Sequence, residues 1–210
     1  MCASSARTWR TCWAWREREE SIEHEAREHR PVPARTAPVA PLRTMRAMNR
    51  QAVIRLVWAF ALSYATAGIG AALTDLGPWY FALKHPAWKP PDAAFGVIWT
   101  TIFTLCAISG WLAWQAANTA ALRRRVAFLF GANALLNILW SALYFKLQRP
   151  DWALFEVVFL WLSIVALIVG LWRLSRWASL LLLSYAVWVS AAAVLNWQTV
   201  QLNGPFAGLP

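Results

Sequence analysis

Residues 152–172 read WALFEVVFLWLSIVALIVGLW, and Glu156 is the one charged residue in this stretch. An α-helix rises ~1.5 Å per residue, so about 20 apolar residues cross a hydrocarbon core of ~30 Å. This stretch has that length, and it has the scarcity of charge that a lipid environment demands. It therefore predicts a membrane-spanning helix.

Four further stretches have the same character: residues 52–73, 94–116, 126–145 and 177–200. The whole chain is 59% hydrophobic with a mean hydropathy of +0.40, which exceeds the apolar share of ordinary soluble domains. The sequence thus predicts an all-α polytopic membrane protein, a bundle of five transmembrane helices.

The net charge of +10 comes from cations at the ends of the apolar stretches. Because they form no continuous basic groove, we expect no nucleic-acid partner. One side of the membrane would carry Arg43, Arg46, Arg50, Arg55, Arg123, Arg124, Arg125, Arg173 and Arg176, and the other side Lys84, Lys89, Lys146 and Arg149. The positive-inside rule then predicts a cytoplasmic N-terminus and an external connection after the first span.

Composition divides the chain into three parts. Residues 1–50 form a charged leader, disordered or partly helical, without the apolar core of a signal peptide. Residues 51–203 form the membrane domain, and 204–210 a short tail. Met45 and Met48 directly precede the first span, and we expect translation to start at one of them.

The connection between the first two spans, residues 74–93, is long and rich in aromatic residues and proline. Prolines hold a stiff, non-helical path, while Trp and Tyr offer flat faces with a polar edge. Ordered loops of this length usually have a function. We interpret this connection as a lid over a site for a flat ligand.

Three spans carry coherent aromatic or polar faces at helical spacing. The stripes are Phe95, Trp99 and Phe103; Asn133, Asn137, Trp140 and Ser141; and Tyr185, Trp188, Ala192, Asn196 and Thr199. Inward-facing polar groups in a membrane can line a pocket, or can merely cross-link helices, which is the structural alternative for Asn137 and Asn196.

Other residues have structural interpretations as well. Ala127 and Gly131 form a small-xxx-small pair, suited to close helix packing within a protomer or in a homodimer. Trp111, Trp114, Trp152, Trp172 and Trp177 lie near span ends, as interface-belt residues do. Glu156 is interpreted as an interfacial anion or a partner of Lys146 or Arg149, with a proton relay as the alternative.

No metal site is predicted, because the three Cys and three His residues lack ligand spacing. The spans contain neither a Ser/His/Asp or Cys/His set nor a nucleotide-binding glycine pattern. The sequence therefore favours a protein that is not an enzyme and requires no cofactor.

Three sequence blocks, in order, resemble the TspO/MBR family, which includes the bacterial tryptophan-rich sensory proteins and the mitochondrial translocator protein. The first block contains Trp79-Tyr80, Pro86, Trp88, Pro90-Pro91, Phe95 and Trp99; the second contains Asn137, Trp140, Ser141, Tyr144-Phe145 and Trp152 to Glu156; the third contains Tyr185, Trp188, Ala192, Leu195-Asn196 and Leu202-Asn203. The resemblance covers residues 52–203.

The resemblance implies a five-helix bundle, commonly dimeric, that binds porphyrins such as protoporphyrin IX or haem-related tetrapyrroles in a pocket under the first connection. Carried over by position, the pocket residues are Trp79, Tyr80, Trp88, Phe95, Trp99, Asn137, Trp140, Tyr185, Trp188 and Ala192. Pro86, Pro90 and Pro91 would shape the lid, and Ala127, Gly131 and Asn196 would pack helices.

Several positions depart from the family pattern. Ser184 replaces a proline before Tyr185 and removes an expected kink, and His85 stands where the family usually has lysine. Ala87 and Ala93 replace aromatic residues of some members, which predicts a wider or differently capped pocket.

The leading functional hypothesis is a bacterial multi-pass membrane receptor or carrier for porphyrins and other flat hydrophobic ligands, with a role in tetrapyrrole regulation, transport or stress signalling. A photo-oxidative porphyrin-degrading enzyme is the first alternative. A non-catalytic membrane scaffold is the second.

Overall fold

The computed structural model describes residues 50–206, which contain helices and no β-strand. Five helical segments in this range are long and apolar enough to cross a membrane. They are α2 (Arg50–Leu73), α4 (Asp92–Ala116), α5 (Ala120–Ser141) continued by the π-helical turn η1 (Ala142–Lys146), α6 (Pro150–Trp172), and α7 (Arg176–Leu181) followed by α8 (Leu183–Asn203). The predicted all-α fold with five spans is confirmed.

The expected leader and the starts at Met45 or Met48 lie outside the described residues, as does the end of the tail, residues 207–210. The sequence did not predict the π-helical turn η1, the break between α7 and α8, or the short helix α3 (Pro78–Ala82). Pro78 stands at its first turn, where a missing N–H costs nothing.

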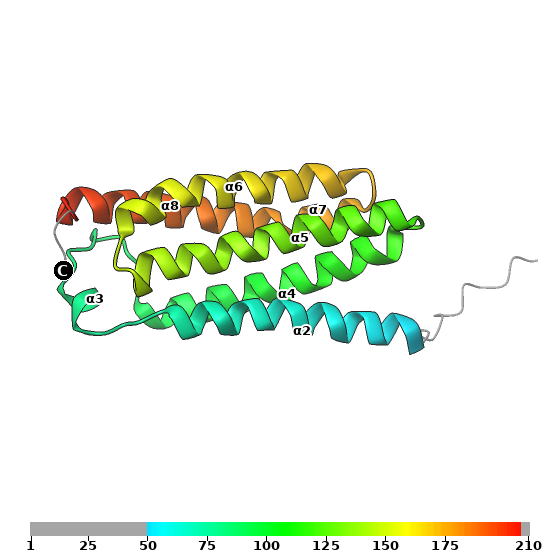
Figure 1. Ribbon diagram of the computed structural model, residues 1–210, viewed down its shortest axis with the longest axis horizontal. Helices are drawn as coiled ribbons and strands as arrows, with labels where there is room; N and C mark the ends of the chain where they lie inside the picture. Colours follow the sequence, from blue (N-terminus) through cyan, green and yellow to red (C-terminus); the bar gives the residue numbers. More distant parts are fainter. Residues whose placement is uncertain (1–49, 207–210) are drawn as a thin grey trace, which may run out of the picture. The chain divides into compact units, whose positions relative to one another are not determined.

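The five spans run side by side along the bundle (Figure 1). Neighbouring helices contact one another in the order α2, α4, α7/α8, α6, α5 and back to α2, so the spans enclose a common interior. The connection between α2 and α4, which includes α3, lies at the same end as the C-terminal end of α8. We call residues 78–91 the lid.

Local sequence signals place the helix ends. Thr119 and Ser175 are N-caps whose hydroxyls accept hydrogen bonds from the backbone N–H groups of Leu122 and Ala178. Pro150 occupies the first turn of α6. Gln148, two residues before Pro150, has a φ of 53°, a left-handed conformation that lets the chain turn sharply between η1 and α6.

The buried core follows α6, which contacts α5, η1, α7 and α8. One cluster joins Ile102, Val157, Leu160, Ile164, Tyr185 and Val189, and a second joins Ala113, Val126, Leu167, Leu171, Ala178 and Leu182. Two serines tie the helices where small side chains bring them close, because Ser109 Oγ donates to the carbonyl of Ala178 (2.7 Å) and Ser179 Oγ to that of Ile168 (2.9 Å).

The fifth span is interrupted at Leu182, although Ser184 replaces the family's proline. Ser184 Oγ donates to the carbonyl of Leu181 (2.9 Å), and the helix resumes with Ala186 N–H donating to the carbonyl of Leu182 (3.0 Å). A serine hydroxyl that competes for helix carbonyls can bend a helix without a proline. Ser184 was expected to remove the kink, but the fifth span is still interrupted.

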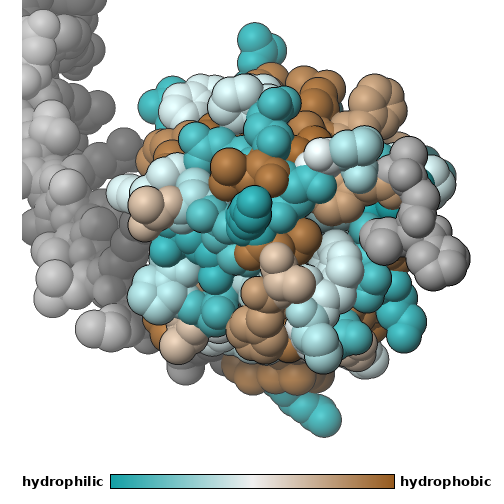
Figure 2. Space-filling view, turned by 90° about the vertical axis from the view of Figure 1, so that its left-hand side faces the viewer, coloured by the Kyte–Doolittle hydropathy of each residue, from teal (hydrophilic) through white to brown (hydrophobic). Residues whose placement is uncertain are grey.

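The outer surface of the spans is strongly apolar. Phe155, Val187 and Trp58 are 73%, 71% and 63% exposed, as are many other large apolar side chains. A soluble protein rarely leaves such a surface open to water, whereas a bilayer covers it. Figure 2 looks onto the lid end, where hydrophilic side chains gather over the middle of the face. The apolar outer surface and the five spans make this a multi-pass integral membrane protein.

Candidate functional site

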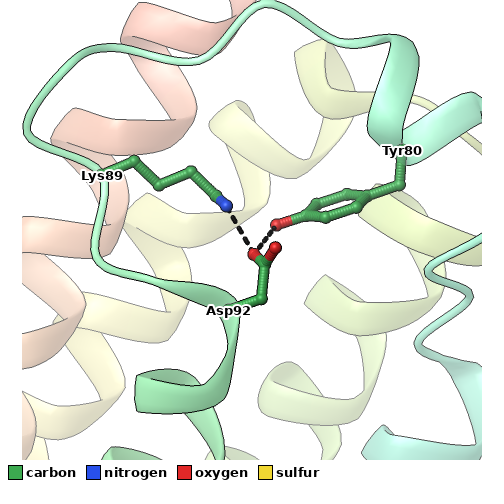
Figure 3. Close-up of polar contacts among 3 residues, drawn as sticks. All are labelled: Tyr80, Lys89 and Asp92. Carbon is green, nitrogen blue, oxygen red and sulfur yellow. Dashed lines mark hydrogen bonds and ion pairs between the residues drawn. The ribbon is translucent and has the colours of Figure 1, made fainter.

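The lid is fastened to the first turn of α4 through one carboxylate. Asp92 Oδ1 accepts a hydrogen bond from the Tyr80 hydroxyl (2.8 Å) and forms an ion pair with Lys89 (Figure 3). Tyr80 comes from α3 and Lys89 from the end of the lid, so Asp92 joins both arms of the connection. Pro86, Pro90 and Pro91 lie in the lid, and their role in shaping it stays a prediction.

A second set of bonds fastens the lid to the end of α8. The side chain of Asn203 accepts from the Lys84 N–H and donates to the Lys84 carbonyl, both at 2.8 Å. Trp88 Nε1 donates to Gln198 Oε1 at 2.6 Å. Asn203 was quoted in the family pattern without a role and Gln198 was missed, because a contact between residues 110 positions apart leaves no local signal.

The environment of the lid shifts two titratable groups. Burial, reinforced by the bond to Asp92, raises the pKa of the Tyr80 hydroxyl above its usual value. Burial, together with the charge of Lys89, lowers the pKa of His85. The His85 ring packs against Tyr80 with 5.2 Å between ring centroids, so a neutral imidazole is part of the lid's packing.

Four of the predicted pocket residues form one aromatic cluster beneath the lid. Trp99 is in edge contact with Tyr185 (6.2 Å between centroids) and Trp188 (6.5 Å), and Phe95 is in edge contact with Trp188 (5.6 Å). We call Phe95, Trp99, Tyr185 and Trp188 the aromatic cluster. It brings the predicted faces of α4 and α8 together.

Trp140 belongs to a neighbouring group of rings. It stacks on Tyr144 (5.1 Å) and meets Phe145 edge-on (5.9 Å), while Tyr80 and Trp79 of α3 contact Phe145 and Tyr144. The π-helical turn η1 supplies both Tyr144 and Phe145, and Tyr144 is buried. Trp79 and Tyr80 of α3 thus pack against the aromatic rings of η1.

Several polar atoms in this region are buried without a hydrogen-bond partner in residues 50–206. They are Nε1 of Trp140 and Trp188 and both ring nitrogens of His85. Buried donors and acceptors are normally satisfied by protein or water. This end of the bundle therefore offers spare hydrogen-bonding capacity to a polar group that enters it.

A cavity of about 480 Å³ lies between α2, α4 and α5 on the other side of the aromatic cluster, with the exposed Trp58 and Leu62 of α2 among its walls. Its walls are Arg55, Trp58, Ala59, Leu62, Ser63, Thr66, Phe103, Cys106, Ala107, Gly110, Trp111, Trp114, Val126, Ala127, Phe130, Gly131, Asn133, Ala134, Asn137 and Tyr185. The volume is in the range of small-molecule sites, and the lining is mainly apolar and aromatic with a few polar groups.

Two of the predicted pocket residues line this cavity and are bonded to each other. Asn137 Nδ2 donates to the Tyr185 hydroxyl at 3.1 Å, and both side chains are buried. Tyr185 also belongs to the aromatic cluster, so it stands between the cavity and the lid. The cavity walls include neither the lid residues nor Trp99, Trp140, Trp188 and Ala192.

The predicted packing residues fall in two different settings. Asn196 is buried between α8 and α6, with its amide within 3.0 Å of the Pro150 carbonyl and the Leu154 N–H. Ala127 and Gly131 lie exposed on α5 at the cavity edge, and a Cβ on Gly131 would meet nothing within 4 Å. The surface of α5 at this small-residue pair is therefore open.

Most of the cavity wall was not predicted from the sequence. On α4 the wall positions are Phe103, Cys106, Ala107, Gly110, Trp111 and Trp114, which repeat at helical spacing and could have been recognised as one face. Trp111 and Trp114 were instead interpreted as interface residues. Trp111 points inward, where its Nε1 donates to the Ala52 carbonyl of α2 at 3.0 Å.

The described residues hold no group of three or more His, Cys, Asp or Glu side chains that could bind a metal ion. Cys106 is a free thiol at the cavity wall. The fold and the site together define a polytopic helical membrane protein with a largely apolar cavity between its helices.

Comparison with known proteins gives the family. The TspO/MBR family profile matches residues 43–202, and the chain belongs to this family. It is 35% identical over 161 residues to the tryptophan-rich protein TspO of Chlorobaculum tepidum, covering 74% of this chain and 99% of that protein. Protein CrtK of Rhodobacter capsulatus is 31% identical over 148 residues (69% and 90%), and the human translocator protein 26% over 120 residues (57% and 71%).

Proposed function

We propose that this protein is a membrane receptor or carrier that binds porphyrins, such as protoporphyrin IX or haem, and serves in tetrapyrrole regulation, transport or stress signalling. The cavity of about 480 Å³ that ends at Asn137 and Tyr185 carries the proposal. It provides a space of ligand size, and it meets two residues assigned to the pocket by family resemblance.

The chemistry of the wall suits an amphipathic macrocycle. Phe103, Trp111 and Phe130 offer flat apolar faces, which favour stacking and burial of an aromatic ring system. At the opposite side from Tyr185, Arg55 lines the cavity and its Nη1 donates to Gln115 Oε1 at 2.8 Å. A porphyrin carboxylate could replace Gln115 as the acceptor, because Arg pairs strongly with carboxylates.

The lid and the aromatic cluster complete the proposed site. Trp79, Tyr80 and Trp88 belong to the fastened cover, while Phe95, Trp99 and Trp188 separate it from the cavity. A ligand that reached the lid would find the unpartnered Nε1 groups of Trp140 and Trp188. In this proposal those residues orient a polar edge of the macrocycle, and Ala192 leaves room beside Trp188.

The proposal is tested by filling the cavity. Protoporphyrin IX is titrated into the purified protein in non-ionic detergent, with quenching of tryptophan fluorescence as the readout. Ala134→Trp places a large ring in the cavity, and we expect at least a tenfold loss of affinity, about 1.4 kcal/mol. Ala65→Trp, on the exposed side of α2, is the matched control and should bind as the unmodified protein does. Equal affinities for both variants would remove the cavity from the site.

A photo-oxidative porphyrin-degrading enzyme remains the second candidate because of the chain of rings that begins at the cavity wall. Tyr185 contacts Trp99, and Trp99 contacts Trp188, so oxidisable side chains lie in sequence beside a bound porphyrin. Illumination of the complex with and without oxygen tests this. Loss of the Soret band at the same rate as for free porphyrin would contradict the enzyme hypothesis. A non-catalytic scaffold, the remaining alternative, would show no saturable porphyrin binding at all.

The proposal extends to assembly and orientation. The open small-residue surface at Ala127 and Gly131 suits a homodimer contact through α5, because small residues let helix backbones approach closely. The cation distribution supports a cytoplasmic N-terminus and an external lid. Crosslinking of Ala127→Cys in membranes tests the homodimer contact. Labelling of Lys84→Cys from outside the cell tests the external position of the lid.

A further inference from the structure

Glu156 is a buried acid that neither the cavity nor the lid uses. It is 4% exposed, and neither carboxylate oxygen has a hydrogen-bond partner in residues 50–206. The expected partners do not reach it: Arg149 forms an ion pair with Asp151 and lies 4.2 Å from the Trp152 ring centroid, and Lys146 makes no ion pair within this range. Within the described chain this carboxyl group therefore has neither a hydrogen-bond partner nor an ion-pair partner.

A groove of about 440 Å³ between α5 and α6 leads to this carboxylate. It is lined by Leu136, Leu139, Leu143, Trp152, Phe155, Glu156 and Phe159. Leu139, Trp152, Phe155 and Phe159 are between 45% and 73% exposed, so they form the open walls, whereas the buried Glu156 lies at the floor. The groove opens on the apolar outer surface of the bundle.

The chemistry of this groove selects a cation with an apolar body. A buried carboxylate without a partner is costly, and a positive charge beside it offsets part of that cost. Aromatic faces attract cations within about 6 Å of the ring, and three of the walls are aromatic. Leu136, Leu139 and Leu143 would hold an alkyl or aryl body.

We infer that the groove between α5 and α6 binds a hydrophobic amine from the bilayer, with its ammonium group against Glu156 and its apolar body between Leu139 and Phe155. This site is separate from the proposed porphyrin cavity and does not depend on it.

A second copy of the chain is a poorer occupant for the same groove. In a two-fold dimer the same patch faces itself. Glu156 is the one charged residue among the groove walls, so such a contact would bring two acids together without a cation.

The experiment measures saturable binding of radiolabelled n-octylamine, which is protonated at pH 7, to the full chain in phosphatidylcholine nanodiscs. Uncharged n-octanol is the matched probe. Glu156→Gln keeps the shape and removes the charge, and we expect at least a tenfold loss of octylamine affinity with unchanged octanol binding. Asp75→Asn, at an exposed acid, should leave both probes unaffected.

A second variant covers the case in which Glu156→Gln does not fold. Leu139→Trp narrows the groove at an exposed wall, so octylamine and octanol should both bind more weakly. Octylamine binding that is absent from the unmodified protein, equal to that of octanol, or unchanged in either variant overturns the inference. A change in particle mass for Glu156→Gln with unchanged amine binding would also overturn it, and would identify the groove as a contact between copies.

Discussion

The two ends of the bundle interior share α4 and Tyr185 of α8 but are filled very differently. Beneath the lid, α4 and α8 contribute Phe95, Trp99 and Trp188, whose rings touch one another. Toward the α4–α5 connection, the inward positions include Ala107, Gly110 and Ala134, and a cavity of about 480 Å³ remains. Side-chain size along each helix therefore decides which end is packed and which can admit a ligand.

The first test of this contrast compares one tryptophan from each end. Trp99→Ala removes a ring that packs on Phe103, Tyr185 and Trp188, and we expect a loss of roughly 3–5 kcal/mol in the free energy of unfolding. Trp58→Ala removes a cavity-wall ring that is 63% exposed, so the loss should stay below about 1 kcal/mol. Unfolding titrations in mixed micelles measure both, and similar losses would break the contrast.

The second test weakens the attachment of the lid to α8. Asn203→Ala removes both bonds to the Lys84 backbone, and at ~0.5–1.5 kcal/mol per bond the lid should open more often by a factor of about ten. Hydrogen exchange of residues 78–91 reports that opening. Gln201→Ala is the control, because Gln201 is exposed and lies two residues before Asn203 on α8. Unchanged exchange after Asn203→Ala would show that Trp88, Tyr80 and Lys89 hold the lid without it.

The third test addresses the residue shared by both ends. Tyr185→Phe keeps the ring in the aromatic cluster and removes the hydroxyl that accepts from Asn137, so stability should fall by only about 0.6 kcal/mol. Thermal unfolding monitored by circular dichroism would detect this small change. A loss as large as that of Trp99→Ala would mean that the polar link, not the ring, connects the two ends.

The smallest expected effect is a pH dependence of the lid. Because the folded pKa of His85 is lowered by burial and by Lys89, the unfolded chain takes up this proton first as the pH falls. The stability associated with a neutral His85 is thus present above the ordinary histidine pKa of about 6.5 and declines below it. His85→Gln should flatten this part of the thermal midpoint profile between pH 7 and 5, and an unaltered profile would assign it to other groups.

The sequence was a good guide to the spans because length and apolarity are local properties of a membrane helix. It was a poorer guide to contacts between distant residues. Gln198 and Asn203 hold the lid from the far end of the chain, and nothing in their neighbourhood signals this. The cavity was missed because a tryptophan near a span end, such as Trp111, has the same local pattern whether it faces lipid or the interior.

The π-helical turn η1 at the end of α5 has a consequence for insertions and deletions. Leu147 N–H donates to the Ala142 carbonyl, five residues earlier, so this turn holds one residue more than an α-helical turn would. Removing one residue from 142–146 would restore regular α-helical spacing without shortening the span appreciably. It would also rotate the following side chains by about 100°. A single extra residue thus determines which side chains face inward beyond Ser141, including the buried Tyr144.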